Sequence, residues 1–147
     1  MLNVTGRRVL LSIHLTLNSI LIGGLVAILV LNFAKQGAHN GDQLYTINLA
    51  IFKIHDIVVM NVGMGVVVTG LLFSLFTKWG FFDFYWVTVK WLSLAILFFV
   101  IIFYLTPAVN SMAAMSDVER VQALSNPDYL HYEKQSAIIV ALLLALL

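Results

Sequence analysis

The feature that most constrains this chain is a long run without charge. Residues 9–33 contain no Asp, Glu, Lys or Arg, and residues 57–76 form a second run of the same kind. A hydrocarbon core about 30 Å thick takes roughly 20 residues of helix at 1.5 Å rise per residue. Each run is therefore long enough to cross a membrane as a helix.

The composition agrees with this interpretation and excludes several classes of protein. Of the 147 residues 61% are hydrophobic and 10% are charged, with a mean hydropathy of +0.98, whereas soluble domains carry about 25% charged residues. The chain is predicted to be an integral membrane protein whose first partner is the lipid bilayer. The absence of Cys excludes disulfides and thiolate metal sites. The net charge of +1 excludes a strongly basic nucleic-acid binder.

The apolar runs predict an all-α fold, namely an integral membrane four-helix bundle forming a single transmembrane domain over residues 1–147. The expected helices cover about residues 9–33, 47–76, 87–105 and 127–147. Pro107 is expected to close the third helix, because proline ends helices well. The first helix has no small-residue cleavage site after a short apolar region, so we interpret it as retained and not as a signal peptide.

The fourth helix needs a separate argument because its apolar run, residues 136–147, is too short to span alone. Asn126 as N-cap and Pro127 at the first helical position move its start to an earlier point. The sequence is still apolar at Leu147, which indicates that the natural helix continues.

The connections between the helices also carry patterns. Ser116 and Glu119 form a capping box in the third connection, which has an apolar residue at every third position: Val109, Met112, Met115, Val118, Val121 and Leu124. This pattern predicts a short amphipathic interfacial helix between the third and fourth helices. The second connection, TKWGFFDFYW over residues 77–86, holds the aromatic residues typical of the membrane interface.

Small residues predict close packing of the first two helices. In the first helix Ser19, Gly23 and Ala27 are four apart, a spacing that lets a neighbouring backbone approach. Gly63, Gly65 and Gly70 are expected to do the same in the second helix, and missing side chains also make room for a flat cofactor.

The distribution of Lys and Arg bears on orientation. The two sides of the membrane carry equal numbers: Arg7, Arg8, Lys78 and Lys90 on the N-terminal side, and Lys35, Lys53, Arg120 and Lys134 on the other. Since the pair before the first helix usually dominates, the N-terminus is placed in the cytoplasm.

Two ionisable residues are expected near the N-terminal side of the membrane. His14 and Asn18 lie on one face of the first helix, and alternating helix direction brings Lys90 to the same depth. An ionisable residue in a membrane helix is a functional hypothesis by default, and neutral imidazole is a ligand for haem iron or copper. For His14 a structural hydrogen bond is the alternative. Lys90 either extends its ammonium to water, salt-bridges a haem propionate, or ligates iron.

A second group of polar residues is expected near the opposite interface. It comprises Lys53, His55, Asp56 and, from the fourth helix, His131. One interpretation is an interfacial polar collar. A sharper one makes His55 and His131 an axial pair for a second haem, or joins them with Asp56 in a metal or proton site. Proton conduction through His55, Asp56 and Asn61 has only local polarity to support it.

The pattern of His14 followed by Gly23 and Gly24 resembles the first helix of the copper-resistance-D-like membrane proteins. It also resembles that of the oxygen-independent protoporphyrinogen oxidase membrane family. WVTVKW (residues 86–91) is similar to their Lys-bearing third helix, and TGLLFSL and YLTP extend the similarity. The chain departs from them at Leu21, where Trp is usual, and lacks the Arg and Tyr that follow the glycines in the oxidases.

The resemblance implies a bacterial cytoplasmic membrane and b-type haem. It implies His14 as haem ligand, with Lys90 as second ligand or propionate partner. Arg7 or Arg8 would also hold a propionate. The leading prediction is a membrane-embedded b-type haem protein in electron transfer or oxidation of a membrane-associated substrate, hence an oxidoreductase.

The alternative is a non-enzymatic accessory subunit of a membrane complex, docking on protein partners or as a homo-oligomer. A copper-handling permease is a further form of it, with Met60, Met64, Met112 and Met115 as soft ligands.

Overall fold

A computed structural model describes residues 3–77 and 84–146 of the chain. These residues are helical almost throughout and contain no strand. The all-helical prediction is therefore confirmed for this part of the molecule. Lys78 and most of the aromatic 77–86 connection lie outside the described residues.

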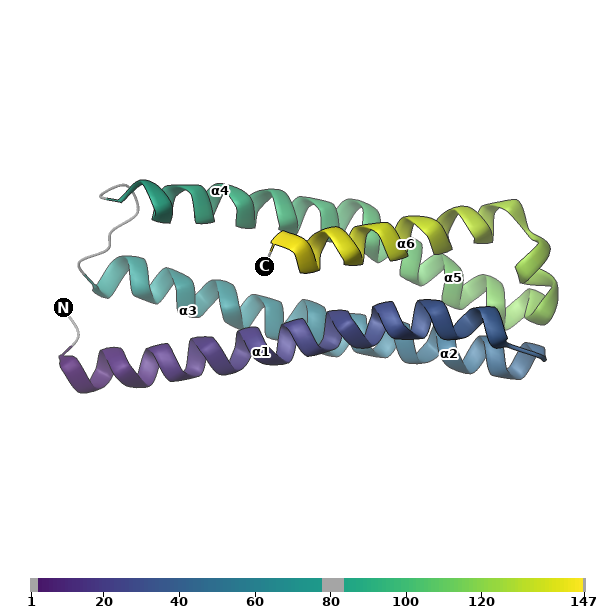
Figure 1. Cartoon of the computed structure of the whole chain (residues 1–147), viewed down its shortest axis with the longest axis horizontal. Coiled ribbons are helices and arrows are strands. Elements are labelled where there is room, and N and C mark those ends of the chain that lie inside the picture. Colours follow the sequence, from purple (N-terminus) through teal and green to yellow (C-terminus); the bar gives the residue numbers. More distant parts are fainter. Residues whose placement is uncertain (1–2, 78–83, 147) are drawn as a thin grey trace.

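Three long helices form most of the bundle (Figure 1). The first is α1 (Val4–Ala34), which continues as a short 3₁₀ turn η1 (Lys35–Gly37). The second joins α2 (Gly41–Ile54), the π-helical segment η2 (His55–Val62) and α3 (Gly63–Phe76). The third joins α4 (Tyr85–Val100), the π-helical segment η3 (Ile101–Leu105), α5 (Thr106–Glu119) and the 3₁₀ segment η4 (Arg120–Ser125).

The fourth helix, α6 (Pro127–Leu146), packs against α1 and α5 and ends about halfway along the bundle (Figure 1). It begins where the sequence predicts, with the Asn126 Oδ1 accepting a hydrogen bond from the Asp128 N–H at 3.0 Å. By length and hydropathy three helices can cross a membrane, Val4–Gly37, Gly41–Phe76 and Tyr85–Ser125. The described part of α6 is not among them.

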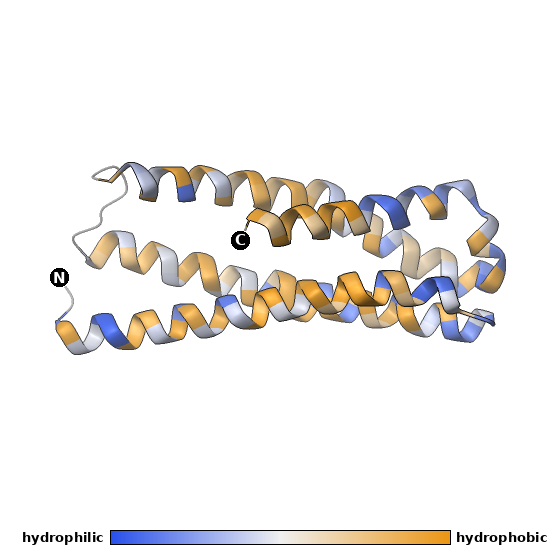
Figure 2. Cartoon of the chain, viewed as in Figure 1, coloured by the Kyte–Doolittle hydropathy of each residue, from blue (hydrophilic) through white to orange (hydrophobic). Residues whose placement is uncertain are grey.

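The long helices exceed the thickness of a hydrocarbon core. Their 34, 36 and 41 residues correspond to roughly 50–60 Å, about twice the 30 Å core. Figure 2 shows apolar residues concentrated along α1, α3 and α4 and polar residues concentrated around the start of α2, the end of α5 and the start of α6. We infer that this polar end extends out of the membrane.

The predicted stop at Pro107 is wrong, because the helix continues through it into α5. The physical reason is the π-helical segment η3 directly before it. A proline ring clashes with the backbone of a regular α-helix, and a wider π turn shifts the hydrogen-bond register there. The Thr106 hydroxyl donates to the Ile101 carbonyl at 2.9 Å and so satisfies one of the displaced acceptors.

The separate interfacial helix is not confirmed. Its residues belong to α5 and η4, which pack against α2 and α6. Val109 and Met112 are buried, whereas Val118 is 83% exposed. Steps of three residues fall short of the 3.6-residue turn, so a strict every-third stripe winds around the helix and cannot stay on one face. Ser116 is in mid-helix and donates to the Ala113 carbonyl, so the predicted capping box is also wrong.

Glycine packing is confirmed at some positions and not at others. A Cβ at Gly24 would lie 2.6 Å from Val58 Cγ1, and one at Gly65 would lie 3.2 Å from Leu17 Cδ1, so α1 approaches η2 and α3 closely there. A Cβ at Gly23 would have nothing within 4 Å. The face of α1 that contains Gly23, which the sequence predicts to pack, therefore points outward. The adjacent face of α1, which contains Gly24, makes the contact with η2.

Candidate functional site

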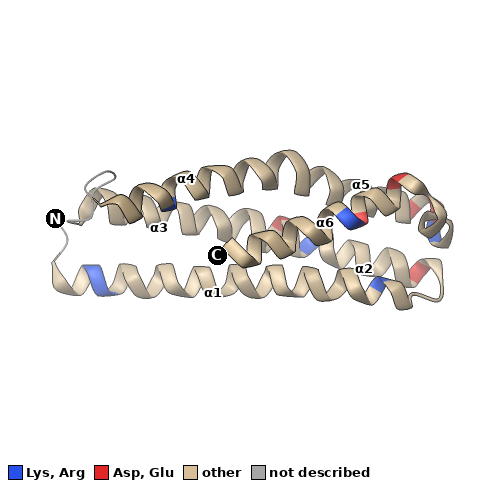
Figure 3. Cartoon of the chain, turned by 45° about the horizontal axis from the view of Figure 1, so that its top comes forward, with Lys and Arg blue, Asp and Glu red and all other residues tan. Residues whose placement is uncertain are grey.

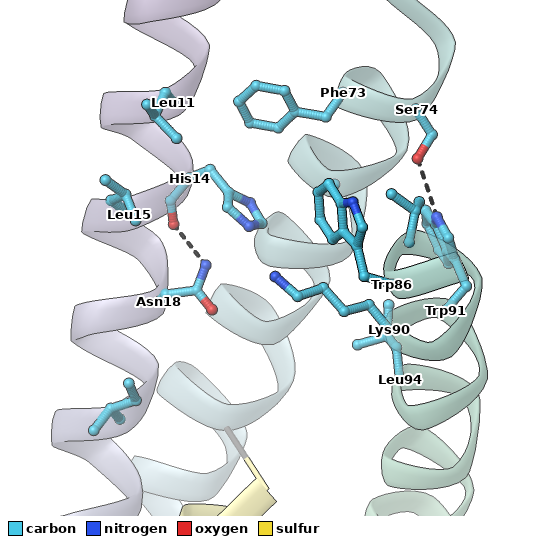
Figure 4. A pocket seen from close by; sticks show the side chains of 13 residues that line it. Leu11, His14, Leu15, Asn18, Phe73, Ser74, Trp86, Lys90, Trp91 and Leu94 are labelled. Carbon is cyan, nitrogen blue, oxygen red and sulfur yellow. Dashed lines mark hydrogen bonds between the residues drawn. The ribbon is translucent and has the colours of Figure 1, made fainter. Parts of the chain in front are cut away.

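A cavity of about 490 Å³ opens between α1, α3 and α4, beyond the described end of α6 (Figures 1 and 4). We call it the His14 pocket. Its walls are mainly apolar and aromatic, and its polar members are His14, Asn18, Ser74, Trp86, Lys90 and Trp91. Its size and mixed lining are typical of sites for small molecules and cofactors, which measure about 300–1,000 Å³.

The His14 ring is held by Thr69 of α3. The Thr69 Oγ1 is 2.7 Å from His14 Nδ1, and it is also 2.8 Å from the Gly65 carbonyl and 3.0 Å from the Val66 carbonyl of its own helix. A hydroxyl has one proton to donate. Because that proton goes to a helix carbonyl, we infer that His14 Nδ1–H donates to Thr69, which leaves the lone pair on Nε2.

Neighbouring groups restrict the His14 ring further. Phe73 meets it edge-on, with ring centroids 5.7 Å apart and planes at 79°. Gly70 of α3 lies beside the ring. A Cβ at this position would be 3.8 Å from His14 Cε1, which is an ordinary contact distance. Asn18 donates to the His14 carbonyl at 2.8 Å. Thr69 and Phe73 thus set the orientation of the imidazole, whose ring lies in the wall of a pocket that is open to a ligand.

Lys90 lines the same pocket from α4 and extends toward His14 and Asn18 (Figure 4). Its Nζ lies 5.1 Å from the centroid of the Trp86 ring, a cation–π distance. The next residue, Trp91, donates through Nε1 to Ser74 Oγ at 3.0 Å and so joins α4 to α3. The structure therefore places His14 and Lys90 in the wall of one pocket, in agreement with the common depth predicted for them from the sequence.

Arg7 and Arg8 do not line the pocket. Both are exposed in the first turns of α1, about 10 Å before His14 along the helix at 1.5 Å per residue. Among the described residues the charges at this end of the bundle are Lys and Arg only, whereas acidic residues gather toward the opposite end (Figure 3).

His55 occupies a different setting. It is 2% exposed, and its Nε2 lies 3.3 Å from Thr106 Oγ1. Since Thr106 gives its proton to the Ile101 carbonyl, we infer that His55 Nε2–H donates to Thr106. The hydrogen bond joins the π-helical segment η2 to the first residue of α5. For His55 the arrangement matches a structural role.

The other predicted members of the second group do not gather around His55. His131 is exposed on α6 and touches Tyr132 edge-on, and Asp56 is exposed on η2. His131 follows the buried Tyr129 by two residues, a helical rotation of about 200° that turns it outward. Within residues 3–77 and 84–146 no three His, Cys, Asp or Glu side chains are grouped to hold a metal. The predicted site of His55, His131 and Asp56 is therefore not assembled.

The methionines proposed for copper also lie in unlike surroundings. The Met112 sulfur is buried and accepts a hydrogen bond from Lys35 Nζ at 3.3 Å. Met64 is 53% exposed on α3. These two side chains do not share a site, which weakens the copper interpretation.

The structure also contains a buried polar cluster around Lys35, a residue that the sequence analysis counts only among the basic residues on the side opposite the N-terminus. Lys35 is 0% exposed; its Nζ is 3.7 Å from Glu133 Oε1 and 5.7 Å from the Tyr129 ring centroid. Tyr129 in turn accepts a hydrogen bond from Asn48 at 2.9 Å. A usable signal existed, because Lys35 lies two residues after the 9–33 run and Glu133 lies three residues before the 136–147 run, and antiparallel helices bring these two ends to the same depth.

Comparison with models of known protein families, with curated proteins and with solved structures finds no match to this chain. The resemblance drawn from the sequence motifs stays a prediction.

Proposed function

We propose that this chain is a membrane-embedded b-type haem protein, with the His14 pocket as its cofactor site, and that it takes part in electron transfer or in oxidation of a membrane-associated substrate. The observation that carries the proposal is the state of His14. Its Nδ1 lies 2.7 Å from the Thr69 hydroxyl, and the ring faces a cavity whose opposite wall carries Lys90. The donation that we infer from Nδ1 to Thr69 leaves the Nε2 lone pair free.

The residues of the pocket fit this group in their chemistry. Haem iron is commonly held by a histidine nitrogen, and a ligating histidine normally donates its other ring N–H to a fixed acceptor, as His14 does to Thr69. Trp86 and Phe73 provide flat apolar contact. Lys90 supplies a cation for a propionate, and Arg7 and Arg8 supply further positive charge toward the N-terminal interface.

The division of labour follows from these positions. Bound haem would supply one-electron redox chemistry. Thr69 would hold the His14 tautomer and so keep the lone pair directed into the pocket. The apolar side chains around them would exclude water, while Lys90 would offset negative charge. Lys90 as a second iron ligand is the alternative use of the same side chain.

The membrane arrangement is part of the proposal. We place the N-terminus in the cytoplasm, because Arg7 and Arg8 directly precede the first apolar run and basic residues favour that side. We also propose that the helix containing α6 crosses the bilayer as the fourth member of the bundle. The resemblance to bacterial haem-associated families favours a bacterial cytoplasmic membrane.

The test is a visible absorption spectrum of the detergent-purified protein, oxidised and then reduced with dithionite, with haem per chain quantified. The wild type is expected to show a reduced b-type α-band. His14→Ala should lose at least nine-tenths of its haem, and the matched control His131→Ala, which removes an exposed imidazole, should keep it. Equal haem content in His14→Ala and wild type would reject the site. A featureless wild-type spectrum, after expression with ample haem, would reject the function and favour an accessory subunit.

A further inference from the structure

Polar side chains lie on the outward face of the second long helix, in the part of the chain that a bilayer would cover. Lys53, Asp56 and Asn61 are all exposed. Ile57, Met64 and Val68, which are 58%, 53% and 47% exposed, continue the same face. We call these six residues the outward stripe.

The depth of the stripe follows from the packing of α1. A Cβ at Gly24 would lie 2.6 Å from Val58 and 3.6 Å from Ile54, so Asp56, between these two residues, lies near the level of Gly24. At 1.5 Å per residue, Gly24 is about 24 Å along α1 from Arg8 and about 16 Å from Lys35. Asp56 is therefore inside the apolar band that a bilayer would cover. Asn61 lies deeper still, two residues before Gly63, which faces Leu21.

These groups are not neutralised within the chain. In the described residues no hydrogen bond or ion pair reaches the Asp56 carboxylate, and Lys53 Nζ has only the face of Phe52 at 5.6 Å. The Asn61 amide donates to the Asp56 backbone carbonyl at 2.8 Å, a bond that the π turn makes possible. Lys53 is long enough to extend toward water, but Asp56 is too short. Ionisable residues at such depth almost always have a partner.

We propose that the outward stripe is the interface with a second copy of this chain, related by a two-fold axis along the membrane normal. In a two-fold interface residue i of one copy meets residue j of the other, and j meets i. The stripe is self-complementary, because Lys53 and Asp56 carry opposite charges. They are three residues apart, which is about 4.5 Å along the helix axis. Each Lys53 would pair with Asp56 of the second copy.

The remaining residues of the stripe suit the same arrangement. Asn61 has both donors and acceptors in one side chain, so it can bond to its own counterpart near the axis, as polar residues do between membrane helices. Ile57, Met64 and Val68 would pack around these bonds. None of the six residues lines the His14 pocket, so this inference does not depend on the proposed haem site.

The first test uses the absence of cysteine from the chain. Met64→Cys is introduced alone into the full chain, and native membranes are treated with copper phenanthroline as oxidant. A disulfide-linked dimer of twice the chain mass is expected. The control, Leu92→Cys, places the thiol at a 64% exposed position on α4 and should give at least tenfold less. Equal yields for the two variants would overturn the proposal.

A charge swap then identifies the occupant of the stripe. In the Met64→Cys background, Lys53→Asp alone or Asp56→Lys alone puts like charges face to face and should lower dimer yield at least tenfold. The double variant K53D/D56K re-forms both pairs between copies and should restore it. Loss of the dimer in each single variant without recovery in the double variant would overturn the pairing of Lys53 with Asp56 between copies. A Met64→Cys background that gives no disulfide-linked dimer would overturn the second copy as occupant. Unchanged yield in the single variants would overturn the charge pairing.

Discussion

Two histidines in apolar helices, His14 and His55, have the same kind of partner and opposite surroundings. Each ring contacts a threonine hydroxyl whose proton goes to a carbonyl of its own helix, the Gly65 or Val66 carbonyl for Thr69 and the Ile101 carbonyl for Thr106. His14 engages its threonine through Nδ1 and faces a cavity. His55, on η2, engages Thr106 at the start of α5 through Nε2 and is only 2% exposed.

Burial of a histidine in a membrane helix therefore does not by itself indicate function. A fully enclosed ring whose Nε2 already makes a hydrogen bond to another helix, as in His55, holds the two helices together. A ring held through Nδ1 and facing an open pocket has space beside it for a ligand, which is the arrangement that the proposed haem site uses. The difference depends on which nitrogen is engaged and on the space beyond it, and each can be broken separately.

The largest expected effect is on stability, and it should separate the two histidines. His55→Ala removes an enclosed ring and leaves a cavity, which costs about 2–4 kcal/mol in the free energy of unfolding by analogy with other large-to-small core changes. His14→Ala opens onto an existing cavity and leaves Thr69 bonded to its own helix, so we expect less than about 1 kcal/mol. Unfolding in a mixed-detergent titration measures both. Similar losses in the two variants would contradict the assignment of roles.

The threonines should separate in the same way, with a smaller effect. Thr69→Val removes the acceptor that fixes the His14 tautomer, and loss of such a support typically lowers affinity about 10–100-fold. We expect that loss in haem titration, with little change in stability. Thr106→Val should instead cost about 1 kcal/mol, the usual scale for a hydrogen bond between membrane helices, and leave haem affinity unchanged. A loss of haem affinity in Thr106→Val equal to that in Thr69→Val would remove the distinction.

The sequence predicts the parts of this molecule that depend on local pattern. The apolar runs predict the long helices, and the antiparallel order of the helices places His14 level with Lys90. Asn126 and Pro127 predict the start of α6 because a cap acts within one turn. Such features need only the spacing of residues along one helix and the approximate thickness of a membrane.

The parts that fail depend on the other helices. Pro107 stays within a helix because the π-helical segment η3 widens the turn before it. No local sequence pattern predicts such a π-helical segment. Lys35 is buried because Glu133, Tyr129 and Met112 meet it from two other helices. Which nitrogen of His14 is free depends on Thr69, a residue 55 positions away. The rotation of a helix about its own axis is likewise not determined by local sequence pattern. For this reason the sequence predicts at Gly23 the close contact that Gly24 makes.

The adjacent glycines Gly23 and Gly24 give the smallest expected effect. Substituting each in turn tests which face of α1 packs against η2, the segment that contains His55. A Cβ at Gly24 would lie 2.6 Å from Val58 Cγ1, within η2, whereas a Cβ at Gly23 would meet nothing within 4 Å. Gly24→Ala should force Val58 to shift and cost about 1 kcal/mol, the low end for overpacking. Gly23→Ala should be neutral or should stabilise by up to about 1 kcal/mol, because alanine is the better helix former. The measurement is the thermal midpoint of each variant in the same detergent. The opposite order, with Gly23→Ala the more damaging, would mean that α1 is rotated by one residue and that a different face of α1 packs against η2.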